Sequence, residues 1–115
     1  MKIQIRRIYE APREDDGIRI FVDRLWARGL KKEDARIDAW EKDLAPSSEL
    51  RKWYGHDPER YEEFRERYLA ELDANPKAAE FAGKMAASEG TVTLLFGAKD
   101  AEHSNAAVLK DWLTS

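Results

Sequence analysis

Hydrophobic and polar residues alternate at the start of the chain, and two short apolar runs follow further on. Apolar side chains at positions 1, 3 and 5 alternate with polar ones at 2, 4 and 6, which is the period of a half-exposed β-strand. The mostly apolar runs at 18–22 and 91–96 are preceded by turn residues, so both indicate more buried strands. We therefore predict strands over about 2–8, 18–23 and 91–96.

The first two predicted strands are separated by about nine residues. A parallel crossover normally needs a dozen or more residues, so an antiparallel pairing is allowed and we leave their relative direction open. The second and third strands are the most apolar, and a small sheet places its most buried strands centrally. We therefore expect these two strands to be neighbours.

Helical spacing fills the region between the second and third strands. Three helix starts combine a capping side chain with a proline: Pro46-Ser47-Ser48, Asp57-Pro58 and Asn75-Pro76. Such pairs are typical of helix N-termini. We predict one helix that Gly55 ends, and two further helices at about 58–72 and 75–88. The segment 31–44 also has helical spacing, but its charge density makes it the least clear part of the chain.

A last helix is predicted at about 101–113, with Asp100 as its N-cap. Trp53 and Trp112 fall on apolar helix faces, so we expect both to be largely buried. Strands with helices between and after them indicate an α/β fold. We predict a single small layered domain over residues 1–115, with a short, mostly parallel sheet flanked by helices.

Composition excludes several classes of function. Lys and Arg number 20 and Asp and Glu 23, a formal net charge of −3, which makes nucleic acid an unlikely partner. There is no Cys, so disulfides, thiolate nucleophiles and Cys-type zinc or iron–sulfur sites are excluded. The two His residues lack metal-site spacing, and no Gly-rich phosphate or dinucleotide motif is present. We expect no metal, no cofactor and no membrane span, and a cytoplasmic location.

Ligands of α/β proteins bind where strands give way to loops at their carboxyl ends. The segment after the second strand carries Arg24, Arg28 and Lys31, with Trp26 between the two arginines. Arginine presents a fixed fork of donors that matches phosphate or carboxylate. These four residues are our candidate ligand-binding residues here. The alternative is that the cations only pair with acidic neighbours at the surface.

The segment after the third strand holds the second group of candidates. Lys99 and Asn105 are candidate ligand-binding residues, because the predicted helix start offers free backbone N–H groups to an anion. If the protein is an enzyme, His103 or Asp100 would move the proton. The alternatives are that Asp100 is no more than a helix cap and that His103 is an ordinary solvated residue.

Several motifs in order carry a resemblance to a known family. They are the segments 23–32, 44–47, 50–58 and 98–103. From about Arg7 to Leu113 the chain resembles the YeaO-like family of small bacterial proteins, domain of unknown function 488. The resemblance implies a compact α/β domain and no established activity, so no catalytic residue is carried over.

Three features depart from that family pattern. Ala27 stands where the family usually has Pro, and Ser104 stands where Asn is common. Longer relatives carry a Cys-His-Arg near the end of the last strand, whereas this chain has no Cys. A thiol mechanism is therefore either not general to the fold or absent here.

Together these patterns predict a small protein that binds an anionic ligand, phosphorylated or carboxylated, between the 24–31 loop and the 99–105 helix start. Whether it is an enzyme is left open. The alternative is a non-catalytic interaction or regulatory module that binds a protein or nucleic acid. Convergence of the candidate side chains in one cavity would favour the ligand site, and an exposed patch would favour the module. The sequence does not indicate an oligomeric state.

Overall fold

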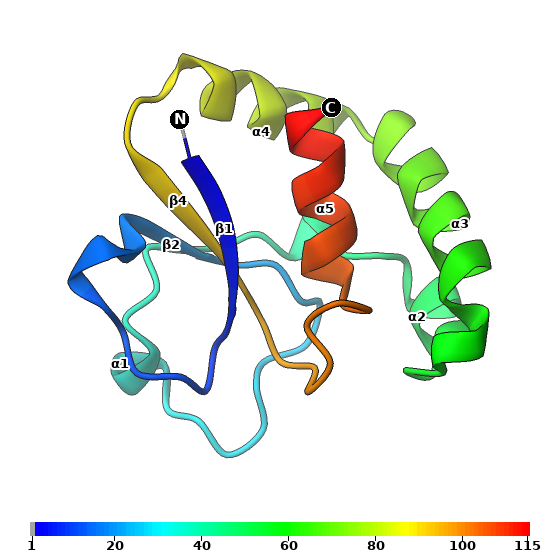
Figure 1. The fold of residues 1–115 in the computed structure, drawn as a ribbon, viewed down its shortest axis with the longest axis horizontal. Helices are drawn as coiled ribbons and strands as arrows, with labels where there is room; N and C mark the ends of the chain where they lie inside the picture. The colour runs from blue at the N-terminus through cyan, green and yellow to red at the C-terminus, as the bar shows by residue number, and fades with distance from the viewer. Residues whose placement is uncertain (1) are drawn as a thin grey trace.

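Four parallel strands form one sheet in the computed structural model, which describes residues 2–115. The strands are β1 (Lys2–Arg7), β2 (Ile18–Phe21), β3 (Ala39–Trp40) and β4 (Thr91–Phe96). Their order in the sheet is β1-β4-β2-β3, so the last strand of the chain lies between the first two (Figure 1). The three predicted strands and the pairing of β2 with β4 are confirmed.

The relative direction of β1 and β2, which the sequence left open, is parallel. Each pairs in parallel with β4 instead of with the other. The short β1–β2 connection is therefore not a crossover between adjacent strands. Gly17 lies in this connection at φ 65°, and a Cβ there would come within 2.0 Å of the Thr91 carbonyl oxygen. Glycine at this position thus allows the connection to pack closely against β4.

Five helices accompany the sheet. They are α1 (Lys32–Ala35), α2 (Ser48–Tyr54), α3 (Tyr61–Asp73), α4 (Pro76–Ala87) and α5 (Asn105–Thr114). Short 3₁₀ turns cover Glu14–Asp16, Lys42–Leu44 and Pro58–Arg60. The predicted caps form as expected, because the side chains of Ser47, Asp57 and Asn75 each accept a backbone N–H bond. The predicted α/β class is confirmed.

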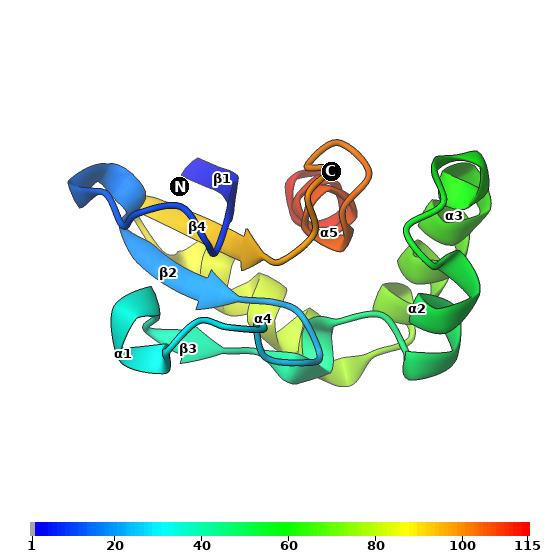
Figure 2. The same cartoon turned by 90° about the horizontal axis from the view of Figure 1, so that it is seen from below.

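The two faces of the sheet are covered unequally. One face presents Ile3, Ile20 and Leu94 to the main hydrophobic core, to which α2, α3, α4 and α5 all contribute. A smaller cluster around Phe21 and Leu95 lies on the other face. Figure 2 shows α1 and β3 beside β2, well apart from α3 and α5. The helices thus concentrate on one side, and a loop and a single helical turn cover the rest.

A buried ion-pair network lies on the second face. Asp16 is buried and pairs with the guanidinium of Arg19, which is buried too. Arg6 donates to the other Asp16 oxygen at 3.1 Å. Arg19 also donates to the carbonyl oxygens of Ala35 at 2.9 Å and Arg36 at 3.2 Å. This network ties the β1–β2 connection to β2 and α1, and its buried charges have hydrogen-bonding partners.

The segment 31–44 differs from the helical spacing seen in the sequence. It forms one turn of helix, the edge strand β3 and a 3₁₀ turn. Arg36 adopts φ 48°, which ends α1 after four residues. Trp40 then packs against Phe21, with ring centroids 5.8 Å apart, and its indole N–H donates to the Asp23 carbonyl oxygen at 2.8 Å. Tertiary packing of Trp40 therefore overrides the local helical pattern.

Two further predictions at the C-terminus are wrong. The last helix begins at Asn105 instead of 101, because Ser104 is its N-cap and accepts the Ala107 N–H at 3.2 Å. Asp100 instead accepts the His103 N–H at 3.3 Å in the preceding turn.

The two tryptophans expected in the core are half-buried. Trp112 lies at the rim, where its indole N–H donates to Asp73 at 2.9 Å. Trp53 is covered by the guanidiniums of Arg60 and Arg67, at 5.3 and 4.6 Å from the ring centroid. Charged side chains, and not the sheet, thus cover the outer part of these rings.

Candidate functional site

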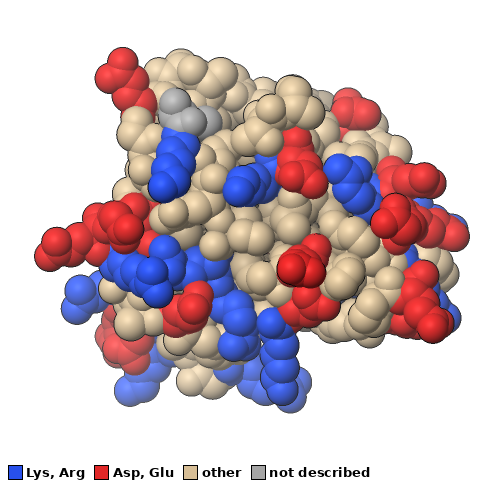
Figure 3. Space-filling model, in the orientation of Figure 1, with Lys and Arg blue, Asp and Glu red and all other residues tan. Residues whose placement is uncertain are grey.

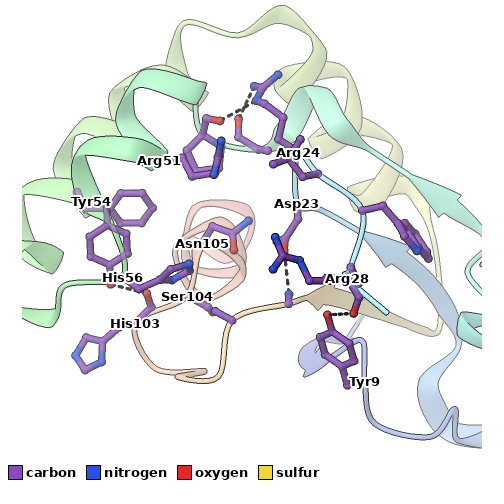
Figure 4. Close-up of a pocket in the computed structure, with 18 residues that line it drawn as sticks. Tyr9, Asp23, Arg24, Arg28, Arg51, Tyr54, His56, His103, Ser104 and Asn105 are labelled. Carbon is purple, nitrogen blue, oxygen red and sulfur yellow. Dashed lines mark hydrogen bonds between the residues drawn. The ribbon is translucent and has the colours of Figure 1, made fainter. Parts of the chain in front are cut away.

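A cavity of about 260 Å³ opens where β2 and β4 end. Figure 4 shows side chains from several elements pointing toward it. Its walls come from the loop after β2, the segment before α2, α2 itself, the turn after it, and the start of α5. This is the location that the strand-end rule selects for a ligand.

Asp23 lies in this cavity as the second residue after β2. Its Oδ2 accepts the Gly97 N–H at 2.9 Å, which fixes the carboxylate against the end of β4. Its Oδ1 is buried and has no hydrogen-bond partner within residues 2–115. Burial raises the pKa of Asp23 above its ordinary value, although the Gly97 N–H and the nearby Asn105 amide oppose the rise. Asp23 is thus a carboxyl group held rigidly with one oxygen unused.

Three arginines line the same cavity. Arg24 donates only to carbonyl oxygens, those of Pro46 at 3.2 Å and Ala45 at 3.4 Å. The Nε of Arg51, on α2, is buried without a hydrogen-bond partner in the described chain. The side chain of Arg28 extends toward the cavity in Figure 4. None of the ion pairs formed among residues 2–115 includes any of these three arginines.

Positively charged side chains also gather on the wider surface. In Figure 3, Lys and Arg gather toward the end of the molecule where β1 and β4 end, whereas Asp and Glu are dense along α3. The protein as a whole is slightly acidic, at −3. A locally positive region on an acidic protein attracts anions to one end of the molecule.

Aromatic side chains form the remaining walls. Tyr54 stacks on Phe64 with ring centroids 4.1 Å apart, and its hydroxyl donates to the His103 carbonyl oxygen at 2.8 Å. Burial raises the pKa of Tyr54 to about 12, so it remains a neutral hydroxyl at physiological pH. Trp26 is fixed by an indole N–H bond to the Leu30 carbonyl oxygen at 2.7 Å. These walls are rigid and apolar, as is usual for small-molecule sites.

Five of the sequence-derived candidates line this cavity: Arg24, Trp26, Arg28, His103 and Asn105. The Asn105 amide also donates to the Val22 carbonyl oxygen at 3.2 Å, which joins α5 to the end of β2. Lys31 and Lys99 do not line the cavity. Both are exposed, and Lys31 is the residue that precedes α1.

The candidate proton-transfer pair forms, but it lies at the side. His103 Nδ1 is 2.6 Å from Asp100 Oδ2, and this bond lowers the pKa of Asp100. The His103 ring packs edge-on against Tyr61 at 4.8 Å. In Figure 4 this ring points away from the cavity, and Asp100 is not among the lining residues. The two side chains therefore face solvent and α3 more than a ligand held by the arginines.

Sequence reasoning missed Asp23, Arg51, Tyr54 and His56 as lining residues. Asp23 lies two residues after β2, so the strand-end rule could have found it; its place between a strand and Arg24 made it resemble an ion-pair partner. Arg51 and Tyr54 carry no such signal, because only the docking of α2 brings them to the strand ends. His56 follows the helix stop at Gly55 and adopts φ 57°, a conformation that a local pattern does not predict.

Residues 2–115 contain neither a metal-binding cluster nor a membrane-spanning helix. No group of three or more His, Asp or Glu side chains in this part of the chain is arranged to hold a metal ion. Every helix in it is too short or too polar to cross a membrane.

Comparison with known proteins places the chain in a family. Residues 2–115 match the family described as the inactive DUF488-N3 subclade, DUF488-N3i. The uncharacterized protein YeaO of Escherichia coli (strain K12) is 44% identical over 115 residues, which cover 100% of this chain and 99% of YeaO. An uncharacterized protein of Mycobacterium tuberculosis (strain ATCC 25618 / H37Rv) is 41% identical over 112 residues, or 97% of this chain and 93% of that relative.

No solved structure gives a significant match to the chain. The family match and the full-length similarity to YeaO nevertheless agree with each other and with the motifs read from the sequence. The chain therefore belongs to the YeaO-like DUF488 family, in its DUF488-N3i subclade.

Proposed function

We propose that this protein binds a small anionic organic molecule, phosphorylated or carboxylated, in the cavity at the carboxyl ends of β2 and β4. One observation carries the proposal: three arginines line a single cavity, and none of them has a carboxylate partner within residues 2–115. Guanidiniums without ion-pair partners attract an anion, which accepts their N–H bonds.

We further propose that binding occurs without turnover. The family description carries the word inactive. The His103 ring points away from the cavity in Figure 4, and Asp100 does not line it. The protein would then act by holding or sensing its ligand, in the manner of a regulatory or carrier domain. A cytoplasmic location, expected from the sequence, belongs to the same proposal.

The test is calorimetric titration and thermal unfolding of the wild type with inorganic phosphate, sugar phosphates, nucleotides and small carboxylates. We expect at least one class to bind and to raise the melting temperature. Charge-assisted bonds of about 1.5–3 kcal/mol each make two or three contacts sufficient for millimolar to micromolar affinity. Added salt should weaken the binding.

The deciding variants are Arg51→Met and Lys52→Met, which remove the same charge from adjacent positions of α2. Arg51 lines the cavity, whereas Lys52 is exposed and does not. Arg51→Met should weaken the binding about 10-fold or more, since one charge-assisted bond is lost; Lys52→Met should leave it nearly unchanged. Failure of every anion to bind, or equal effects of the two substitutions, would reject the site and favour the interaction module.

A further inference from the structure

Two buried polar atoms lack a hydrogen-bond partner among the described residues, and both belong to residues that line the cavity. They are Oδ1 of Asp23 and Nε of Arg51. An unsatisfied buried donor or acceptor costs about 1–3 kcal/mol, so proteins rarely leave one without reason. Two such atoms on residues that line one small cavity indicate that a bound molecule completes both.

The two atoms need opposite kinds of hydrogen-bond partner. Arg51 Nε can only donate a hydrogen bond, and a carboxylate oxygen of Asp23 can only accept one. An anion alone satisfies Arg51 but meets a carboxylate at Asp23, which repels it. The polar atoms of the cavity are thus not those of a simple phosphate or carboxylate site.

The position of the Asp23 oxygen is fixed by its surroundings. The Gly97 N–H holds Oδ2 at 2.9 Å, and a Cβ on residue 97 would lie only 3.1 Å from the same oxygen. The carboxyl group therefore rests tightly against the backbone at the end of β4. Rotation that would carry Oδ1 to another partner within the chain would break the bond to Gly97.

We infer that the ligand carries an N–H donor, such as a protonated amine or an amide, in addition to its anionic group, and that this donor binds Oδ1 of Asp23. The inference rests on the proposed function, because it assigns the second half of the molecule that the arginines hold. The anion lies toward Arg51, Arg24 and Arg28, and the nitrogen lies at the floor formed by Asp23.

The size of the cavity and its apolar wall limit the class of ligand. A cavity of about 260 Å³ lies at the small end of ligand sites, which usually enclose roughly 300–1,000 Å³. Trp26, Phe64 and Leu25 supply an apolar wall beside the polar atoms. The class that fits is a compact amino-bearing acid: an amino acid, an aminoalkyl phosphate or an amino-sugar phosphate.

The experiment uses matched pairs of probes that differ only by the nitrogen: ethyl phosphate and phosphoethanolamine, propionate and β-alanine, glucose 6-phosphate and glucosamine 6-phosphate. Calorimetric titration of the wild type should show the amino-bearing member of at least one pair binding about 10-fold more tightly. Equal affinities within every pair would overturn the inference and leave the proposed function standing. Binding of no probe at all would reject both.

The substitution Asp23→Asn replaces a hydrogen-bond acceptor by a donor at one position. The amide oxygen can keep the Gly97 bond, which places the NH₂ group where Oδ1 was, so an acceptor becomes a donor. The variant should lose the preference for the amino-bearing member and bind the amine-free anion at least as well as the wild type does. An unchanged preference would contradict the assignment. Asp34→Asn, an exposed carboxylate outside the cavity, is the matched control and should keep the wild-type preference.

Discussion

Two groups of arginines in this small protein have opposite surroundings. Arg6 and Arg19 converge on the buried carboxylate of Asp16, and Arg19 also reaches two backbone carbonyls. Arg24, Arg28 and Arg51 converge on a cavity in which the nearby carboxylate, Asp23, forms no ion pair with them. The comparison teaches that a buried cation with partners in the chain supports the fold, whereas cations gathered without such partners indicate recognition of something else.

The largest expected effect on stability comes from removing the carboxylate that Arg6 and Arg19 share. Asp16→Ala leaves the buried Arg19 guanidinium without its counter-charge, which typically costs about 3–5 kcal/mol. Urea unfolding followed by fluorescence should show this loss. Adding Arg19→Met to Asp16→Ala should restore part of the stability, because the double variant has no unpaired buried charge. A loss below about 1 kcal/mol in the single variant would mean that the network is dispensable.

The same carboxylate predicts sensitivity to acid. Burial acts to raise the pKa of Asp16, but the Arg13 N–H and the guanidiniums of Arg19 and Arg6 together hold it below its usual range. A folded-state pKa below the unfolded value of 3.8 stabilises the protein above that pH. This stability is lost as the pH falls through the folded-state pKa. Unfolding free energies measured from pH 7 down to pH 2 should therefore drop more steeply below about pH 4 in the wild type than in the double variant.

The pKa of Asp23 is shifted in the opposite direction to that of Asp16, so its effect on stability should also be opposite. Burial raises the pKa of its carboxyl group, so ionisation of this residue opposes folding as the pH rises from the unfolded-state pKa through the folded one. Asp23→Asn should therefore stabilise the ligand-free protein at pH 7, by about 1 kcal/mol, because the neutral amide places no charge in the buried position. The gain should vanish near pH 3, where the wild-type carboxyl group is protonated. Destabilisation at pH 7 would show that the charge of Asp23 serves the fold.

The smallest effect is expected at Arg51. No ion pair or hydrogen bond within residues 2–115 restrains its Nε, so Arg51→Met should lower the free energy of unfolding by no more than about 0.5 kcal/mol, as for most substitutions outside the structural network. The comparison becomes sharp when this value is set beside the large loss in ligand affinity that the same variant should show. A large loss of stability would move Arg51 into the structural group.

The elements that could be predicted from the sequence are those set by local chemistry. Apolar runs located β2 and β4, and the Ser47, Asp57 and Asn75 caps located the starts of the central helices. The edge strand β3 escaped because two residues have no periodicity of their own. Its strand conformation depends on Trp40 packing against Phe21, a contact that the local pattern does not specify.

The residues of the candidate site can also be divided into those that the local sequence indicates and those that depend on tertiary packing. The strand-end rule found Arg24, Trp26, Arg28 and Asn105, because all four lie within nine residues after β2 or β4 in the chain. Arg51 comes from a helix whose approach to the strand ends is a matter of tertiary packing. Lys99 and Lys31 show the reverse error: they are near the right elements in sequence, yet both project into solvent.

The position of β4 in the sheet has a consequence for synthesis on the ribosome. About 70 residues lie between the end of β2 and the strand that separates it from β1, which at roughly 5–20 residues per second takes about 4–14 s to translate. During that time β1 has no neighbour to pair with and β2 has only the two-residue edge strand β3, and unpaired strands are prone to aggregate. The sheet can form only when the last quarter of the chain leaves the ribosome. Folding is therefore a late event for the whole polypeptide, and a nascent chain stalled before Thr91 is a natural client for chaperones.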